Sequence, residues 1–115
     1  MNDSDSVIRS TEPLPDGLMM VLQGDVDLSR SPALRLELLN ALDGKPKRLL
    51  VDLAEVSYMD SSGVATLVEA LQHQRRSGGQ MILCALQPRV RSIFEIARLD
   101  SVFTIVDDTE QAKTI

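Results

Sequence analysis

Four consecutive residues in the middle of the chain, Asp60-Ser61-Ser62-Gly63, have side chains suited to the start of a helix. Asp and Ser accept hydrogen bonds from the free N–H groups of a first helical turn. A Ser there also presents its hydroxyl beside an electropositive array of N–H groups, which tolerates a phosphate well. Two interpretations stay open at this point: a plain helix cap, or a serine that is phosphorylated.

A second acidic segment, Asp25-Val26-Asp27, follows a continuous apolar run at Leu18–Leu22. In open parallel sheets, functional residues collect at the carboxyl ends of the strands. Both acidic segments meet that description, so we expect them near one end of the sheet. A phosphoserine there adds about −1.5 to −2 charges and changes the surface potential beside these carboxylates.

The elements that position these segments follow from hydrophobic periodicity. Apolar runs predict strands, and apolar residues at i, i+3, i+4 and i+7 predict helices. Ser31 as N-cap and Pro32 as first helical residue begin one helix, which Gly44 ends. Residues 23–27 are predicted to leave the sheet, and residues 54–59 lead from the next strand to Asp60. The expected strands are 7–9, 18–22, 49–53, 81–85 and 102–106, and the expected helices lie between Ser31 and Gly44, between Gly63 and Gly78, from Pro88 to Ala97, and from Asp108 to Ile115.

This order, β-β-α-β-α-β-α-β-α, predicts an α/β fold. Near-continuous apolar strands alternating with amphipathic helices favour a mostly parallel sheet of four to five strands, with an antiparallel edge strand and about four helices. A length of 115 residues fits one domain, 1–115, in which residues 1–6 are expected to be a flexible N-terminus.

Composition excludes several classes of function. The chain has 17 Asp and Glu against 12 Lys and Arg, a net charge of −5, whereas nucleic-acid binding needs a basic patch. One Cys and one His argue against a disulfide framework, a Cys-based zinc site or another cofactor, and Cys84 is expected in the core. No run reaches the ~20 apolar residues of a membrane span. The polar, acidic N-terminus is unlike a secretory signal, so a cytoplasmic location is expected.

Enzymatic activity is not expected. The chain lacks the Gly-x-Ser-x-Gly elbow of a serine hydrolase, and its one His, His73, lies three turns past Ser62. The phosphate loop of nucleotide hydrolases is also missing. A receiver-like phospho-acceptor domain is a remote alternative, because Asp25, Asp27 and Asp52 lie near strands; however, Asp25 and Asp27 are not adjacent and no Lys-Pro pair follows a late strand.

The stretch from Val51 to Val64, with Asp-Ser-Ser-Gly near its end, resembles the signature of anti-sigma factor antagonists of the STAS domain family. Gly24-Asp25-Val26-Asp27 is similar to that family's Gly-acidic-aliphatic-Asp element. The resemblance covers roughly residues 17–108, and the further segments that fit it are Gly78–Met81 and Pro88–Val90, followed by Phe94 and Leu99.

The resemblance implies a binding module that works as a switch. Members of the family bind an anti-sigma factor that is also a serine kinase with an ATP-binding fold, and this binding makes it release its sigma factor. The kinase phosphorylates a serine of the motif, which abolishes binding, and a serine phosphatase reverses it. The matching serine is Ser62, with Ser61 as the fallback, and the expected partner-binding residues are Asp25, Asp27, Met59, Asp60, Ser61, Ser62 and Gly63.

A second function within the same family stays open. STAS domains also serve as non-switching scaffold subunits, for example on a lipid-transport ATP-binding-cassette complex. In that case the helix face from Ser62 to Leu71 docks on a constant partner, and Ser61 and Ser62 only cap the helix.

Overall fold

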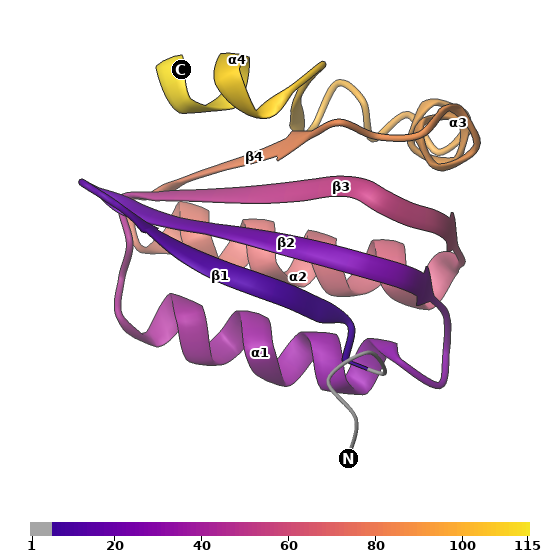
Figure 1. Cartoon of the computed structure of the whole chain (residues 1–115), viewed down its shortest axis with the longest axis horizontal. Coiled ribbons are helices and arrows are strands. Elements are labelled where there is room, and N and C mark those ends of the chain that lie inside the picture. The colour runs from indigo at the N-terminus through magenta and orange to yellow at the C-terminus, as the bar shows by residue number, and fades with distance from the viewer. Residues whose placement is uncertain (1–5) are drawn as a thin grey trace.

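Five strands form one sheet whose spatial order follows the chain, from β1 to β5 (Figure 1). The computed structural model describes residues 6–115. The strands are β1 (Ile8–Leu14), β2 (Gly17–Val26), β3 (Arg48–Met59), β4 (Gln80–Cys84) and β5 (Thr104–Val106), and the helices are α1 (Ser31–Asp43), α2 (Ser61–Arg76), α3 (Pro88–Ile96) and α4 (Thr109–Thr114).

Strand β1 pairs with β2 in antiparallel orientation, and every other pairing in the sheet is parallel. Helices α1 and α2 lie side by side along one face of the sheet, and the short α4 lies on the other face (Figure 1). The predicted α/β fold, with a mostly parallel sheet and an antiparallel edge strand, is confirmed.

Alternate side chains of the central strand β3 point to opposite faces, which explains why Leu49, Leu50 and Val51 are apolar at successive positions. Leu49, Val51 and Leu53 belong to the larger core, together with the leucines of α1 and α2. Leu50 belongs to a smaller core on the opposite face, together with Ala112 of α4. A strand that is covered on both faces needs apolar residues at successive positions, not at alternate ones.

Two strands continue beyond their predicted ends. Strand β2 extends to Val26 and β3 to Met59, in parallel register with Val26 opposite Met59. The backbone ladder satisfies N–H and C=O groups whatever the polarity of the side chains. Residues 23–26 therefore stay in the sheet, contrary to the prediction, and the sheet also includes residues 54–59. At Gly24 the φ angle is 77° and a β-carbon would lie 2.3 Å from Nη1 of Arg30, so this irregular position requires glycine.

Helix α1 starts one residue earlier than predicted. Arg30, not Ser31, is the N-cap residue, and Ser31 is the first helical residue. Edge strand β1 is also longer than the predicted 7–9, and the last strand is shorter, at Thr104–Val106. The N-terminus predicted to be flexible is residues 1–6, of which residues 1–5 lie outside the described part of the chain. Ser6 is held by two hydrogen bonds: its hydroxyl accepts from the N–H of Ile8, and its carbonyl accepts from Nε2 of Gln23.

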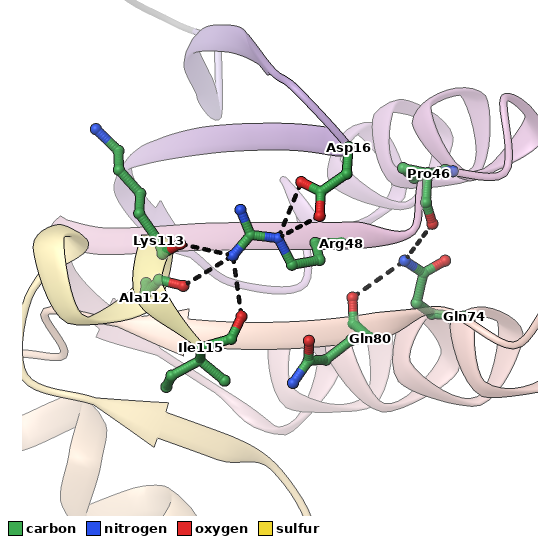
Figure 2. A network of polar contacts seen from close by, with 8 residues as sticks. All are labelled: Asp16, Pro46, Arg48, Gln74, Gln80, Ala112, Lys113 and Ile115. Carbon is green, nitrogen blue, oxygen red and sulfur yellow. Dashed lines mark hydrogen bonds and ion pairs between the residues drawn. The ribbon is translucent and has the colours of Figure 1, made fainter.

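Two side chains tie together the end of the sheet at which β3 and β4 begin (Figure 2). Arg48 donates from Nε to Asp16 at 3.0 Å and from Nη1 to the carbonyls of Lys113 at 2.9 Å and Ile115 at 3.1 Å, which holds the last turn of α4. Gln74 of α2 is fully buried and donates from Nε2 to the carbonyls of Pro46 and Gln80 at 2.9 and 3.1 Å. Side-chain donors on Arg48 and Gln74 therefore bind backbone carbonyls at this end of the sheet and hold α4 and the starts of β3 and β4 in place.

The thiol of Cys84 is expected to be inert in the folded protein. It is fully buried in β4, and burial, followed by the charges of Asp52 and Asp108, raises its pKa to about 12. Only the thiolate reacts rapidly with disulfide reagents. In an Ellman assay at pH 8, native protein should react far more slowly than protein in denaturant; equal rates would contradict the burial.

Within residues 6–115, none of the helices has the length and apolar content to cross a bilayer.

Candidate functional site

The candidate site lies at the carboxyl ends of β2 and β3. Because Val26 pairs with Met59, the residues that follow each strand leave the sheet side by side. Asp60 directly precedes α2, and Asp27 begins the turn that leads into α1. Parallel pairing thus brings the two acidic segments of the sequence together, as expected for an open sheet.

Asp60 is the N-cap of α2, which begins at Ser61 and not after Gly63 as predicted. Its Oδ1 accepts from the N–H groups of Ser62 at 2.9 Å and Gly63 at 3.2 Å, and from the Ser62 hydroxyl at 2.5 Å. Its Oδ2 accepts from the N–H of Leu28 at 3.0 Å, which links the start of α2 to the loop between β2 and α1. The hydrogen bond from the Ser62 hydroxyl is the main cause that lowers the pKa of Asp60, against the opposing effect of desolvation.

Asp27 stabilises the turn that leads into α1, whose N-cap residue, Arg30, makes no side-chain cap hydrogen bond. Its Oδ1 accepts from the hydroxyl of Ser29 at 2.8 Å and from the N–H groups of Ser29 and Arg30 at 3.1 and 3.2 Å. The Ser29 hydroxyl is the main cause that lowers the pKa of Asp27. An Asp two residues before a Ser, as in Asp27 and Ser29, often forms such a turn. This turn and the Ser31-Pro32 pair predict different start residues for α1.

Ser62 occupies the space between the two helix starts. Its side chain is half-buried, and its Oγ lies 2.6 Å from Oγ of Ser31. The Ser31 hydroxyl also lies 2.5 Å from the carbonyl oxygen of Asp27. The contact between the two serines, which are 31 residues apart in the chain, had no signal in the sequence.

Two of the predicted partner-binding residues lie in the interior. Met59 is 1% exposed and packs in the larger core. Gly63 is buried, and a β-carbon on it would lie 2.7 Å from the carbonyl oxygen of Val26. These two residues hold β2 and α2 close together, and their side chains are not part of the surface around Ser62.

The exposed residues at this end of the sheet include Asp25, Leu28 and Ser61, and we refer to these three as the switch surface. Asp25 is exposed and accepts a 3.3 Å hydrogen bond from the Ser57 hydroxyl; Ser61 is exposed at the first helical position. Leu28 was not predicted. It is 74% exposed although its N–H is held by Asp60, so an apolar side chain stands on a fixed backbone beside the serines.

The Asp60 cap gives the folded state a pH dependence. A carboxyl whose pKa is lowered by folding stabilises the fold above its ordinary value of 3.8 and loses that contribution as the pH falls through the lowered value. We therefore expect Asp60→Asn to unfold at lower urea concentration than wild type at pH 7, with the difference shrinking below pH 4. Asp25→Asn removes a charge at the same end of the sheet without touching the cap, and a pH-independent gap for Asp60→Asn would contradict this role.

No cluster of three or more His, Cys, Asp or Glu side chains arranged for a metal ion occurs within residues 6–115. The carboxylates of Asp27 and Asp60 are each occupied by backbone amides and a serine hydroxyl. What the arrangement offers chemically is a serine hydroxyl at a helix N-terminus, next to an exposed surface.

Comparison with known proteins gives consistent matches over nearly the whole chain. A family model described as the STAS domain matches residues 8–112. The chain is 32% identical over 98 residues to a putative anti-sigma factor antagonist, BtrV, of Bordetella bronchiseptica, covering 84% of each protein. It is 32% identical over 92 residues to the anti-sigma-B factor antagonist of Listeria monocytogenes, covering 78% of this chain and 79% of the relative.

Among solved structures, the fold is similar to that of the Bacillus cell fate determinant SpoIIAA in its phosphorylated form. The TM-score is 0.71 at 23% identity, and the alignment covers 90% of this chain and 93% of that one. At this identity the likeness establishes the shared fold.

Proposed function

The chain belongs to the STAS domain family, and from that premise we propose that it is an anti-sigma factor antagonist whose binding is switched off by phosphorylation of Ser62. It binds an anti-sigma factor that is also a serine kinase, so that this partner releases its sigma factor. In this role the protein is a cytoplasmic binding module and not an enzyme. Two relatives at 32% identity that are named as antagonists support the proposal.

One observation carries the assignment of the switch: the Ser62 hydroxyl lies at the N-terminus of α2, beside the exposed side chains of the switch surface. A helix N-terminus stabilises added negative charge, so a phosphate there is compatible with the fold. A related fold has been solved in a phosphorylated form, which supports the idea that this architecture accepts the modification. Burial of both serines in the core would have argued against it.

The modification itself is a phosphoryl transfer from ATP bound to the partner kinase. A bond forms between Ser62 Oγ and the γ-phosphorus while the bond from that phosphorus to the bridging oxygen breaks, and ADP leaves with the electron pair. The hydroxyl proton passes to a base on the kinase. A serine phosphatase restores the hydroxyl by hydrolysis, which makes the switch reversible.

Phosphorylation changes the interface more than it changes the fold. The net charge of −5 and the exposed Asp25 suit a partner with a basic surface, and complementary charge mainly increases the association rate and the specificity. A phosphate inside the contact area must be desolvated for binding. It also stands next to the ionised Asp60, whose donor hydroxyl it has consumed.

The proposal is tested by incubating the protein with the candidate kinase and ATP and locating added phosphate by peptide mass spectrometry. We expect one phosphate on the peptide that contains Ser61 and Ser62, retained in Ser61→Ala and lost in Ser62→Ala. Phosphate that persists in Ser62→Ala and disappears in Ser61→Ala would move the switch to Ser61. No phosphate on either serine would reject the switch.

A further inference from the structure

The first turns of α1 and α2 meet through two serine hydroxyls. Oγ of Ser31 lies 2.6 Å from Oγ of Ser62, and Ser31 is only 5% exposed. On its far side, the Ser31 hydroxyl is 2.5 Å from the carbonyl oxygen of Asp27. On its own far side, the Ser62 hydroxyl is 2.5 Å from Oδ1 of Asp60. Four oxygen atoms therefore form a chain with three short contacts.

Only two protons are available for these three contacts. Each serine hydroxyl carries one proton, and Asp60 is ionised at neutral pH because its pKa is lowered, mainly by the hydrogen bond from Ser62. The Asp27 carbonyl already accepts from the N–H groups of Arg30 at 3.1 Å and Ser31 at 2.8 Å. The Ser31 hydroxyl thus has two acceptors within reach, the Asp27 carbonyl at 2.5 Å and Ser62 Oγ at 2.6 Å. Because that carbonyl already accepts from two N–H groups, we infer that Ser31 donates to Ser62 and that Ser62 donates to Asp60.

In this arrangement the Ser62 hydroxyl is engaged on both sides. Its proton is given to Asp60 and one of its lone pairs receives the Ser31 proton. Asp60 is a poor base for a phosphoryl transfer, because three backbone amides hold its carboxylate in the charged form. The Ser62 proton must therefore leave toward the kinase, which requires the hydroxyl to turn away from Asp60 and Ser31.

We propose that Ser31 is a positioning residue that holds the Ser62 hydroxyl in a resting orientation toward α1 and thereby slows its phosphorylation. The consequence for the kinase rests on the proposed function, whereas the resting orientation itself does not. The reactive orientation is populated only when the bond from Ser31 is broken. Removing one neutral hydrogen bond raises that population, and with it kcat/KM for phosphorylation, by about fivefold.

The first experiment measures the orientation without any partner. Scalar couplings between Hα and the two Hβ protons of Ser62 report its χ1 angle in solution. We expect one staggered rotamer in wild type. In Ser31→Ala we expect couplings shifted toward the average, because a second rotamer gains population beside the one that Asp60 still holds. Ser29→Ala is the matched control, because it removes a hydroxyl from the same loop that bonds to Asp27 and not to Ser62. Couplings that stay unchanged in Ser31→Ala overturn the proposal.

The second experiment measures initial rates of phosphorylation by the partner kinase with ATP. Ser31→Ala should be phosphorylated about fivefold faster than wild type, a change seen in kcat/KM, and Ser29→Ala at the wild-type rate. A loss of fold would slow the reaction and lower the melting temperature, which separates it from the expected gain. An unchanged or reduced rate in a folded Ser31→Ala protein overturns the proposal. If the kinase modifies neither protein, the proposed function fails while the couplings still decide the orientation.

Discussion

Ser62→Asp is expected to bind the anti-sigma factor at least about a hundredfold more weakly than Ser62→Ala, and the phosphorylated protein about a thousandfold more weakly. These losses correspond to ~3 and ~4 kcal/mol of binding free energy. The added charge must be desolvated in the contact area, and it stands beside the carboxylate of Asp60, to which Ser62 no longer donates. Ser62→Ala keeps the surface neutral at this point and should bind whether or not ATP is present.

The measurement is a calorimetric titration of each variant with the purified anti-sigma factor. The fold should survive both substitutions: Ser62→Ala removes only one hydroxyl, and negative charge at a helix N-terminus is favourable by about 0.3–1 kcal/mol. Thermal melts check this directly. Ser61→Asp is the matched control: it adds the same charge one residue away, at an exposed position, and should weaken binding less. Equal affinity of Ser62→Asp and Ser62→Ala would refute the switch.

The largest effect on stability is expected at Gln74. Its Nε2 donates to two backbone carbonyls, of Pro46 and Gln80, in a fully buried position at the start of β3 and β4 (Figure 2). Gln74→Glu replaces this double donor by a carboxylate that faces the same two acceptors. An uncompensated buried charge costs about 3–5 kcal/mol. We therefore expect the urea midpoint to fall sharply at pH 7.

The pH dependence of this variant follows from the same physics. Burial raises the pKa of a carboxyl above its unfolded value, so the destabilisation should be greatest at neutral pH. It should lessen as the pH falls, because a protonated carboxyl regains one donor. Gln72→Glu is the matched control, since it makes the same change at an exposed position of α2 and should shift stability by no more than about 0.5 kcal/mol. Similar midpoints for the two variants would contradict the role of Gln74.

Most of the architecture was predictable because its signals are local. The leucines at 34, 38 and 42 recur with the period of a helix, and all three are buried. Asp60 was predictable as a cap because an N-cap residue acts on amides only two and three positions ahead. Where two local signals competed, as at Asp27 and Ser31, the sequence could not say which would win, and the start of α1 was misplaced by one residue.

The strand ends were not predictable for a different reason. The polar residues at 23–27 look like a loop, but β2 continues to Val26 because pairing with β3 supplies hydrogen bonds to the backbone. Such pairing depends on a partner about 30 residues away and not on the side chains of the segment itself. The same holds for the interior position of Met59, which a longer β3 carries into the core.

By itself, the sequence determined the α/β class, the order of the elements, the Asp60 cap and the serine pair that follows it, since each depends on periodicity or on neighbours within one helical turn. Only the tertiary structure decided that Ser31 and Ser62 are in contact and that Leu28 is exposed near them. The same holds for the hydrogen bonds from Gln74 to the carbonyls of Pro46 and Gln80. Those contacts arise from the parallel register that places Val26 opposite Met59 and from the packing of α1 beside α2. Register and packing are set by the burial of the whole apolar core, which no short stretch of sequence encodes.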